Sequence, residues 1–130
     1  MPTILIVEDH ADNMVLTVLL LQSAGYAVLS ASDAEAGLTM ARAERPDLIL
    51  MDIHLPGMDG LEATALLKRD AATSAIPVIA LTALAMKGDE ERIRAAGCDG
   101  YIAKPIRIHQ FLATIAAQLG EPAPEPANEM

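Results

Sequence analysis

Five polar side chains lie at the ends of short apolar runs. They are Glu8 and Asp9 after the run 4–7, Asp52 after 48–51, Thr82 after 78–81, and Lys104 after 101–103. In an open parallel α/β sheet the carboxyl ends of the strands gather at one edge, where such folds place their sites. Three carboxylates, a hydroxyl and an ammonium group at that edge predict a pocket for a divalent metal and a phosphoryl group.

The three acids predict a cation in this pocket. At an effective dielectric of ~20, two carboxylates ~4 Å apart repel by roughly 4 kcal/mol, so the cluster needs a proton or a metal ion. Mg²⁺ prefers hard oxygen ligands, keeps several waters and uses one or two carboxylates directly. We predict that Asp9 and Asp52 ligate Mg²⁺, that Glu8 reaches it through water, and that the backbone carbonyl of His54 is a third protein ligand.

With the metal in place, Asp52 is a carboxylate nucleophile suited to forming an acyl phosphate. Phosphoryl transfer depends mainly on positioning and on neutralising charge. We expect the metal to contact one phosphoryl oxygen, Lys104 a second, and the Thr82 hydroxyl with nearby backbone N–H groups the third. An X-Pro peptide bond tolerates the cis form better than others, and a cis bond before Pro105 would direct Lys104 to the site.

The same residues predict a switch. A phosphorylated Asp52 gives the Thr82 hydroxyl a new hydrogen-bond partner. If Thr82 moves inward, it vacates space into which Tyr101 can rotate. This difference in side-chain contacts would bias two states of the surface.

Apolar runs of four to six residues alternate with longer amphipathic stretches, which is typical of βα units around a parallel sheet. We predict strands near 3–8, 27–31, 47–52, 76–81 and 99–102, and helices near 12–24, 33–44, 60–70, 87–96 and 107–119. The expected fold is a doubly wound (βα)5 domain, a flavodoxin-like three-layer sandwich with strand order 2-1-3-4-5. This order makes Asp9 and Asp52 neighbours.

Several residues mark the predicted helix boundaries. Gly25 is expected to end the first helix, and Pro46 stops the second. The sequence Ser-Asp-Ala-Glu at 32–35 predicts a capping box that opens the second helix. Asp59 is expected to cap the third helix, with Glu62 completing a box.

Composition excludes several classes of protein. The net charge of -9 argues against a nucleic-acid binder, because such proteins present a basic face to phosphates. No segment approaches the ~20 apolar residues that span a bilayer, and no signal peptide is evident. Cys98 is the only cysteine, which fits a reducing cytoplasm. We expect one cytoplasmic domain over 1–119, followed by a disordered Pro/Glu-rich tail over 120–130.

The motifs closely resemble the receiver domain of two-component response regulators, which share the fold of the chemotaxis response regulator. The matching segments are Ile-Leu-Ile-Val-Glu-Asp at 4–9, Pro-Asp-Leu-Ile-Leu-Met-Asp at 46–52, Leu-Pro-Gly-Met-Asp-Gly at 55–60, Leu-Thr-Ala at 81–83, and Lys-Pro at 104–105. The resemblance covers residues 3–119. The segment 83–92 is also similar to the DivK type of single-domain cell-division regulators.

The resemblance implies that Asp52 is phosphorylated by a histidine kinase or a histidine phosphotransfer protein. It assigns Glu8 and Asp9 as metal acids, Thr82 and Tyr101 as the switch pair, and Lys104 as the phosphate contact. It also implies that downstream proteins dock on the face formed by the fourth helix, fifth strand and fifth helix. The sequence departs from the DivK type at His10, where Asn or Asp is usual, and this departure leaves the metal ligands in place.

Other functions remain open on the sequence. One alternative is a phosphorelay shuttle, and another is a phosphorylation-independent scaffold, although a scaffold does not require the site residues. A haloacid-dehalogenase-like phosphatase is disfavoured because His54 stands where its second acid belongs. A nucleotide-binding domain lacks support, since no glycine-rich phosphate loop follows the first strand. We expect a non-enzymatic phosphoacceptor that loses its phosphate slowly, and metal roles for the His10 and His54 side chains are not expected.

Overall fold

The structure is a computed structural model that describes residues 2–83 and 87–120. Strands and helices alternate along this part of the chain. Their order is β1 (Thr3–Val7), α1 (Ala11–Ser23), β2 (Ala27–Ala31), α2 (Ala34–Glu44), β3 (Leu48–Asp52), α3 (Gly60–Arg69), β4 (Val78–Thr82), α4 (Lys87–Ala95), β5 (Gly100–Ala103) and α5 (Ile108–Leu119). Each predicted element is present, with bounds shifted by two residues at most. Beyond Gly120, the predicted tail lies outside the described residues.

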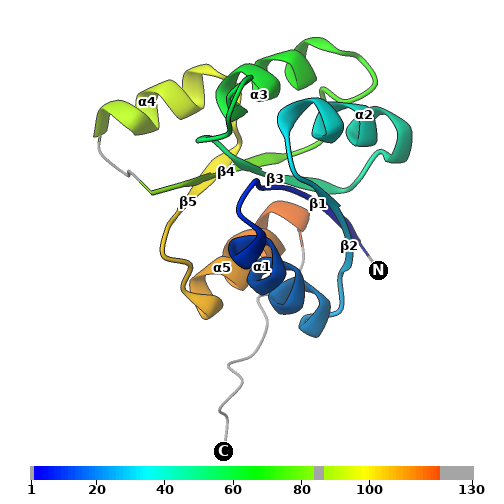
Figure 1. Ribbon diagram of the computed structural model, residues 1–130, viewed down its shortest axis with the longest axis vertical. Coiled ribbons are helices and arrows are strands. Elements are labelled where there is room, and N and C mark those ends of the chain that lie inside the picture. The colour runs from blue at the N-terminus through cyan, green and yellow to red at the C-terminus, as the bar shows by residue number, and fades with distance from the viewer. Residues whose placement is uncertain (1, 84–86, 121–130) are drawn as a thin grey trace, which may run out of the picture.

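The strands form one parallel sheet in the order β2-β1-β3-β4-β5. Helices α1 and α5 cover one face of the sheet, and α2, α3 and α4 cover the other (Figure 1). The predicted doubly wound, flavodoxin-like fold and its strand order are therefore confirmed. Among the described residues, no helix is both long and apolar enough to cross a membrane.

The core consists of two aliphatic layers, one on each side of the sheet. Leu5 and Val7 of β1 belong to the layer under α2 and α3, whereas Ile4 and Ile6 belong to the layer that contains Phe111 of α5. Every residue of β3 and β4 is buried. Burial on both faces explains why these strands are continuous apolar runs rather than alternating ones.

The structure corrects the cap predicted for α2. Ser32 was expected to cap this helix with Glu35, but the N-cap is Asp33, whose carboxylate accepts a hydrogen bond from Ala36 N–H at 2.7 Å. An aspartate caps at least as well as a serine, and its negative charge also suits the helix N-terminus. The α3 cap is confirmed, because the carboxylate of Asp59 accepts from the N–H of the third helical residue at 2.8 Å.

The start of α3 packs tightly on the end of β3. A Cβ atom placed on Gly60 would lie 2.7 Å from Ile53 Cα, which is closer than real Cβ contacts come. Only glycine therefore allows this approach between the helix and the backbone that follows Asp52.

Candidate functional site

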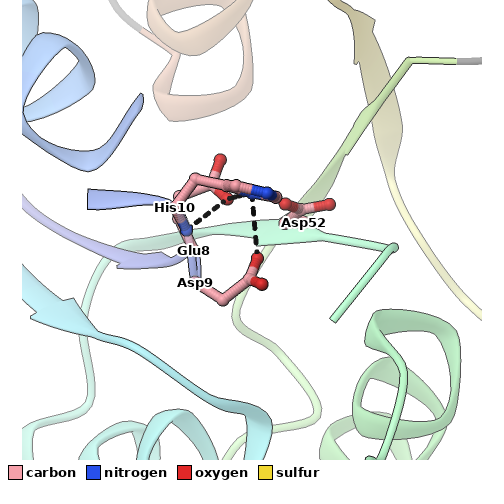
Figure 2. Close-up of side chains that lie close together, drawn as sticks. All are labelled: Glu8, Asp9, His10 and Asp52. Carbon is pink, nitrogen blue, oxygen red and sulfur yellow. Dashed lines mark hydrogen bonds and ion pairs between the residues drawn. The ribbon is translucent and has the colours of Figure 1, made fainter. Parts of the chain in front are cut away.

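Four side chains from two neighbouring strands meet at the carboxyl edge of the sheet. Glu8, Asp9 and His10 follow β1, and Asp52 is the last residue of β3 (Figure 2). One potential ligand atom of each lies within 4.8 Å of the corresponding atoms of the other three. The side chains of Glu8 and Asp52 are each only 1% exposed. The proximity predicted for Asp9 and Asp52 is thus confirmed.

Lys104 lies between the two buried acids. Its Nζ is 3.1 Å from Glu8 Oε1 and 3.2 Å from Asp52 Oδ2. The other Asp52 oxygen, Oδ1, accepts a hydrogen bond from the backbone N–H of His54 at 2.9 Å. The Lys104-Pro105 peptide bond is cis, as the sequence suggested. Lys104 therefore joins the acidic cluster from the loop that follows β5.

These contacts shift the pKa values of the two buried acids, Glu8 and Asp52, in opposite directions. Burial raises the pKa of Glu8, and a hydrogen bond shared with Asp52 raises it further. Burial also acts to raise the pKa of Asp52, but hydrogen bonds from Glu8, His54 N–H and Lys104 outweigh it and hold this pKa below its usual value. Asp52 is consequently the acid that stays ionised, as a carboxylate nucleophile must.

The pKa of the Lys104 ammonium group is raised, although the group is partly buried. Burial acts to lower its pKa, whereas its hydrogen bond to Glu8 and the negative charge of Asp52 raise it, and the net shift is upward. Lys104 therefore remains a cation in the pocket. Its charge is available to the oxygens of an incoming phosphoryl group as well as to the carboxylates.

Asp9 provides a direct test of whether the residues fit a divalent cation. Its Oδ1 is a buried atom that makes no hydrogen bond among the described residues, and its ion-pair contact is with His10 Nδ1 at 3.2 Å, which is charged only when the ring is protonated. A buried carboxylate oxygen without a hydrogen bond is costly, and a hard cation would satisfy it. The oxygen donors of Asp9 and Asp52 therefore fit a Mg²⁺ site.

The structure brings His10 into this cluster, which the sequence analysis did not expect. Its Nδ1 lies 3.3 Å from Glu8 Oε2 and 3.2 Å from Asp9 Oδ1. The position of a histidine directly after an acid pair was visible in the sequence. The orientation of its ring could not be read from the sequence, because the ring of a residue at a helix start can also face solvent.

The predicted switch residues lie on β4, which is the neighbour of β3, and on β5, which pairs with β4 at the edge of the sheet. Thr82 is the last residue of β4 and is fully buried. Tyr101 is half-buried on β5, and its hydroxyl donates a hydrogen bond to Glu90 of α4, which raises the Tyr101 pKa. In this arrangement Tyr101 links β5 to α4. The side chain of His54 is exposed, and its predicted carbonyl ligand stays a prediction.

Comparisons with known proteins point to one family. A family model described as "Response regulator receiver domain" matches residues 4–116. The chain is similar to the polar-differentiation response regulator DivK of Brucella anthropi, with 50% identity over 119 residues that cover 92% of this chain and 97% of the relative. The corresponding DivK protein of Brucella ovis matches equally well, at 50% identity over the same shares.

Solved structures agree with the sequence comparison. The receiver domain of the sensor histidine kinase PA1611 from Pseudomonas aeruginosa has a TM-score of 0.86 and 35% identity, covering 92% of this chain and 98% of that one. That structure has a magnesium ion coordinated in its active-site cleft. The Vibrio cholerae chemotaxis protein CheY4 has a TM-score of 0.86 and 27% identity, covering 90% of this chain and 98% of that one.

Proposed function

The chain belongs to the response regulator receiver domains, the signalling domains of two-component systems, and from this premise we propose that Asp52 is its phosphoacceptor. The observation that carries this assignment is the pair of donors on its carboxylate. The His54 N–H contacts one oxygen at 2.9 Å and the Lys104 ammonium contacts the other at 3.2 Å. We propose a histidine kinase or a histidine phosphotransfer protein as the phosphodonor, acting in the cytoplasm.

The reaction transfers a phosphoryl group from a phosphohistidine to an Asp52 oxygen. The new P–O bond forms as the P–N bond breaks, and the donor nitrogen keeps the electron pair. Lys104 neutralises charge on a phosphoryl oxygen, and we assign the Thr82 hydroxyl to a second one. Asp9, Asp52 and the His54 carbonyl would hold Mg²⁺, with Glu8 reaching it through water. The bound ion supplies charge neutralisation on the transferring group.

A donor protein needs a surface beside Asp52 on which to dock, and α1 offers one. Of the five large apolar side chains that are exposed within the described residues, Val15, Leu16 and Leu19 lie on this helix. Leu16 also lines a groove of about 160 Å³ that reaches Lys104 and Glu8. We propose that an apolar helix face of the phosphodonor packs on this α1 patch, because the groove connects it directly to the site.

The signal leaves through protein contact. We propose the α4-β5-α5 face as the surface for the downstream partner. The Tyr101–Glu90 hydrogen bond supports this, because it couples β5, whose neighbour β4 ends in Thr82, to the surface of α4. Movement of Thr82 toward a phosphorylated Asp52 would change the space available to Tyr101 and so the contacts of α4. Passing the phosphoryl group onward in a phosphorelay uses the same site chemistry, and slow hydrolysis of the acyl phosphate returns the domain to its resting state.

The test is the intact mass of the protein after incubation with Mg²⁺ and acetyl phosphate. We expect one added phosphoryl group, which is absent without metal and absent from Asp52→Asn. Asp12→Asn is the matched control, because its exposed carboxylate lies on the neighbouring helix α1. Labelling of Asp52→Asn at the level of the unsubstituted protein would refute the assignment. No labelling of a folded, Mg²⁺-binding protein would favour a phosphorylation-independent scaffold.

A further inference from the structure

We propose that the His10 ring supplies a nitrogen ligand to the divalent ion of this site, so that the site favours Co²⁺, Ni²⁺ or Zn²⁺ over Mg²⁺. The inference rests on the proposed function only in requiring that the site binds a divalent ion. Imidazole nitrogen suits the later first-row dications, whereas Mg²⁺ is best served by oxygen. One nitrogen among the carboxylates therefore increases the margin by which the pocket binds these ions more tightly than Mg²⁺.

The spacing of the donor atoms matches that of ligands around one ion. Two ligands at right angles and ~2.1 Å from a metal are about 3.0 Å apart. His10 Nδ1 is 3.2 Å from Asp9 Oδ1, a direct ligand in the proposed site, and hydrogen-bonds at 3.3 Å to Glu8 Oε2, the acid that we place one water away from the ion. An Asp52 oxygen lies within 4.8 Å of a His10 ring nitrogen, a limit that includes the ~4.2 Å between ligands on opposite sides of an octahedral ion.

The His10 ring does not cap α1, and its contacts among the described residues are with Glu8 Oε2 and Asp9 Oδ1. His10 is the N-cap residue of α1, yet its side chain makes no capping hydrogen bond. Ser, Thr, Asp and Asn are the residues that cap helices well, and histidine is not among them. The ring turns instead toward the acids (Figure 2), where Asp9 Oδ1 is buried and without a hydrogen bond among the described residues.

The surroundings give a hydrated ion access to these donors. A cavity of about 320 Å³ opens beside Glu8 and Asp9 and is lined on its far side by Ser30 and Ser32. The His10 side chain is 65% exposed, so one side of the cluster faces solvent. An ion can therefore exchange its waters for protein ligands without any opening of the buried core.

The experiment compares metal binding by the full chain and by His10→Asn, using titration calorimetry with Mg²⁺ alone and with Ni²⁺ alone. We expect His10→Asn to lose about tenfold or more in Ni²⁺ affinity, since disturbing even an outer ligand partner costs 10–100-fold. Its Mg²⁺ affinity should change less than about threefold, because Asp9 and Asp52 remain. His109→Asn is the matched control, since His109 is exposed on α5 and lies outside the cluster.

A spectroscopic measurement separates ligation from an indirect effect. The proton NMR spectrum of the Co²⁺-loaded protein should contain a strongly shifted, exchangeable ring N–H signal that disappears in His10→Asn and persists in His109→Asn. Absence of this signal, or an unchanged ratio of Ni²⁺ to Mg²⁺ affinity in His10→Asn, would overturn the inference and leave the Mg²⁺-dependent phosphoacceptor intact. If neither Mg²⁺ nor Ni²⁺ binds the folded protein, the inference and the proposed metal site both fail.

Discussion

Lys104→Met should destabilise the protein whereas Asp52→Asn should not, although each removes one charge from the same pocket. Lys104 Nζ lies 3.1 Å from a Glu8 oxygen and 3.2 Å from an Asp52 oxygen. At an effective dielectric of ~20, each contact corresponds to about 5 kcal/mol of attraction. Lys104→Met removes both attractions and leaves two buried carboxylates facing one another.

The expected loss for Lys104→Met is smaller than the sum of these attractions. Removing one partner of a buried pair costs about 3–5 kcal/mol. We expect about 3 kcal/mol, the lower end of that range, because the Lys104 side chain is 21% exposed and is partly screened by water. Glu8 also relieves the repulsion by taking up a proton, which its raised pKa favours.

Asp52→Asn removes the attraction to Lys104 but also the repulsion from two acids. Glu8 and Asp9 each have an oxygen within 4.8 Å of Asp52, and at that distance each repels it by about 3.5 kcal/mol at a dielectric of ~20. With Glu8 ionised the difference, about 7 against about 5 kcal/mol, favours the amide by about 2 kcal/mol, and protonation of Glu8, which its raised pKa favours, cancels this gain. We therefore expect Asp52→Asn to be unchanged or more stable in metal-free buffer.

Urea unfolding followed by far-UV circular dichroism, in low-salt buffer with EDTA, measures both changes. The double variant Lys104→Met with Asp52→Asn completes the cycle and should recover part of the loss, because only one buried acid then lacks its partner. A Lys104→Met protein within about 1 kcal/mol of the unsubstituted one would refute this account, given the usual cost of breaking a buried pair. So would a large loss of stability in Asp52→Asn.

Substitutions at two positions test how the site is held, and one labelling rate tests the burial of the core. Gly60→Ala should cost more than about 2 kcal/mol in urea unfolding and should slow phosphorylation, because the added methyl overlaps the backbone at Ile53. Asp59→Ala should cost about 1 kcal/mol by losing the cap on Glu62 N–H, whereas Asp59→Asn, which keeps an acceptor, should cost less. Cys98 should react with iodoacetamide far more slowly in the native protein than in urea, because burial raises its thiol pKa; equal rates would contradict its burial.

The fold and most of the site follow from the sequence because a parallel sheet gathers strand ends. Once the apolar runs are taken as strands in the order 2-1-3-4-5, Asp52 must lie beside the residues that follow β1. Lys104 follows β5, so it reaches the site once β5 joins the sheet in parallel, with its carboxyl end at the same edge as those of β1 and β3. Chain connectivity and the burial of both sheet faces therefore determine these neighbours.

Side-chain orientation is what the sequence did not provide. The α2 cap moved from Ser32 to Asp33 because two good capping residues stand side by side, and only the backbone path decides between them. The ring orientation of His10 was undetermined for the same reason, since the ring could face either solvent or the acids. The unequal proton affinities of Glu8 and Asp52 also depend on a particular set of hydrogen bonds.

The crowding of charge in the pocket connects its stability with its proposed function. A pocket optimised for folding alone would not bury Glu8 and Asp52 around one ammonium group and leave Asp9 Oδ1 without a hydrogen bond among the described residues. A bound divalent cation offsets the repulsion among these carboxylates. It therefore stabilises the folded protein, because it binds the folded state and not the unfolded one. The phosphorylated Asp52 then adds negative charge that the cation and Lys104 already offset. Asp52, whose replacement by Asn should not destabilise the metal-free protein, is therefore the residue on which phosphotransfer depends, as expected when activity requires a destabilised site.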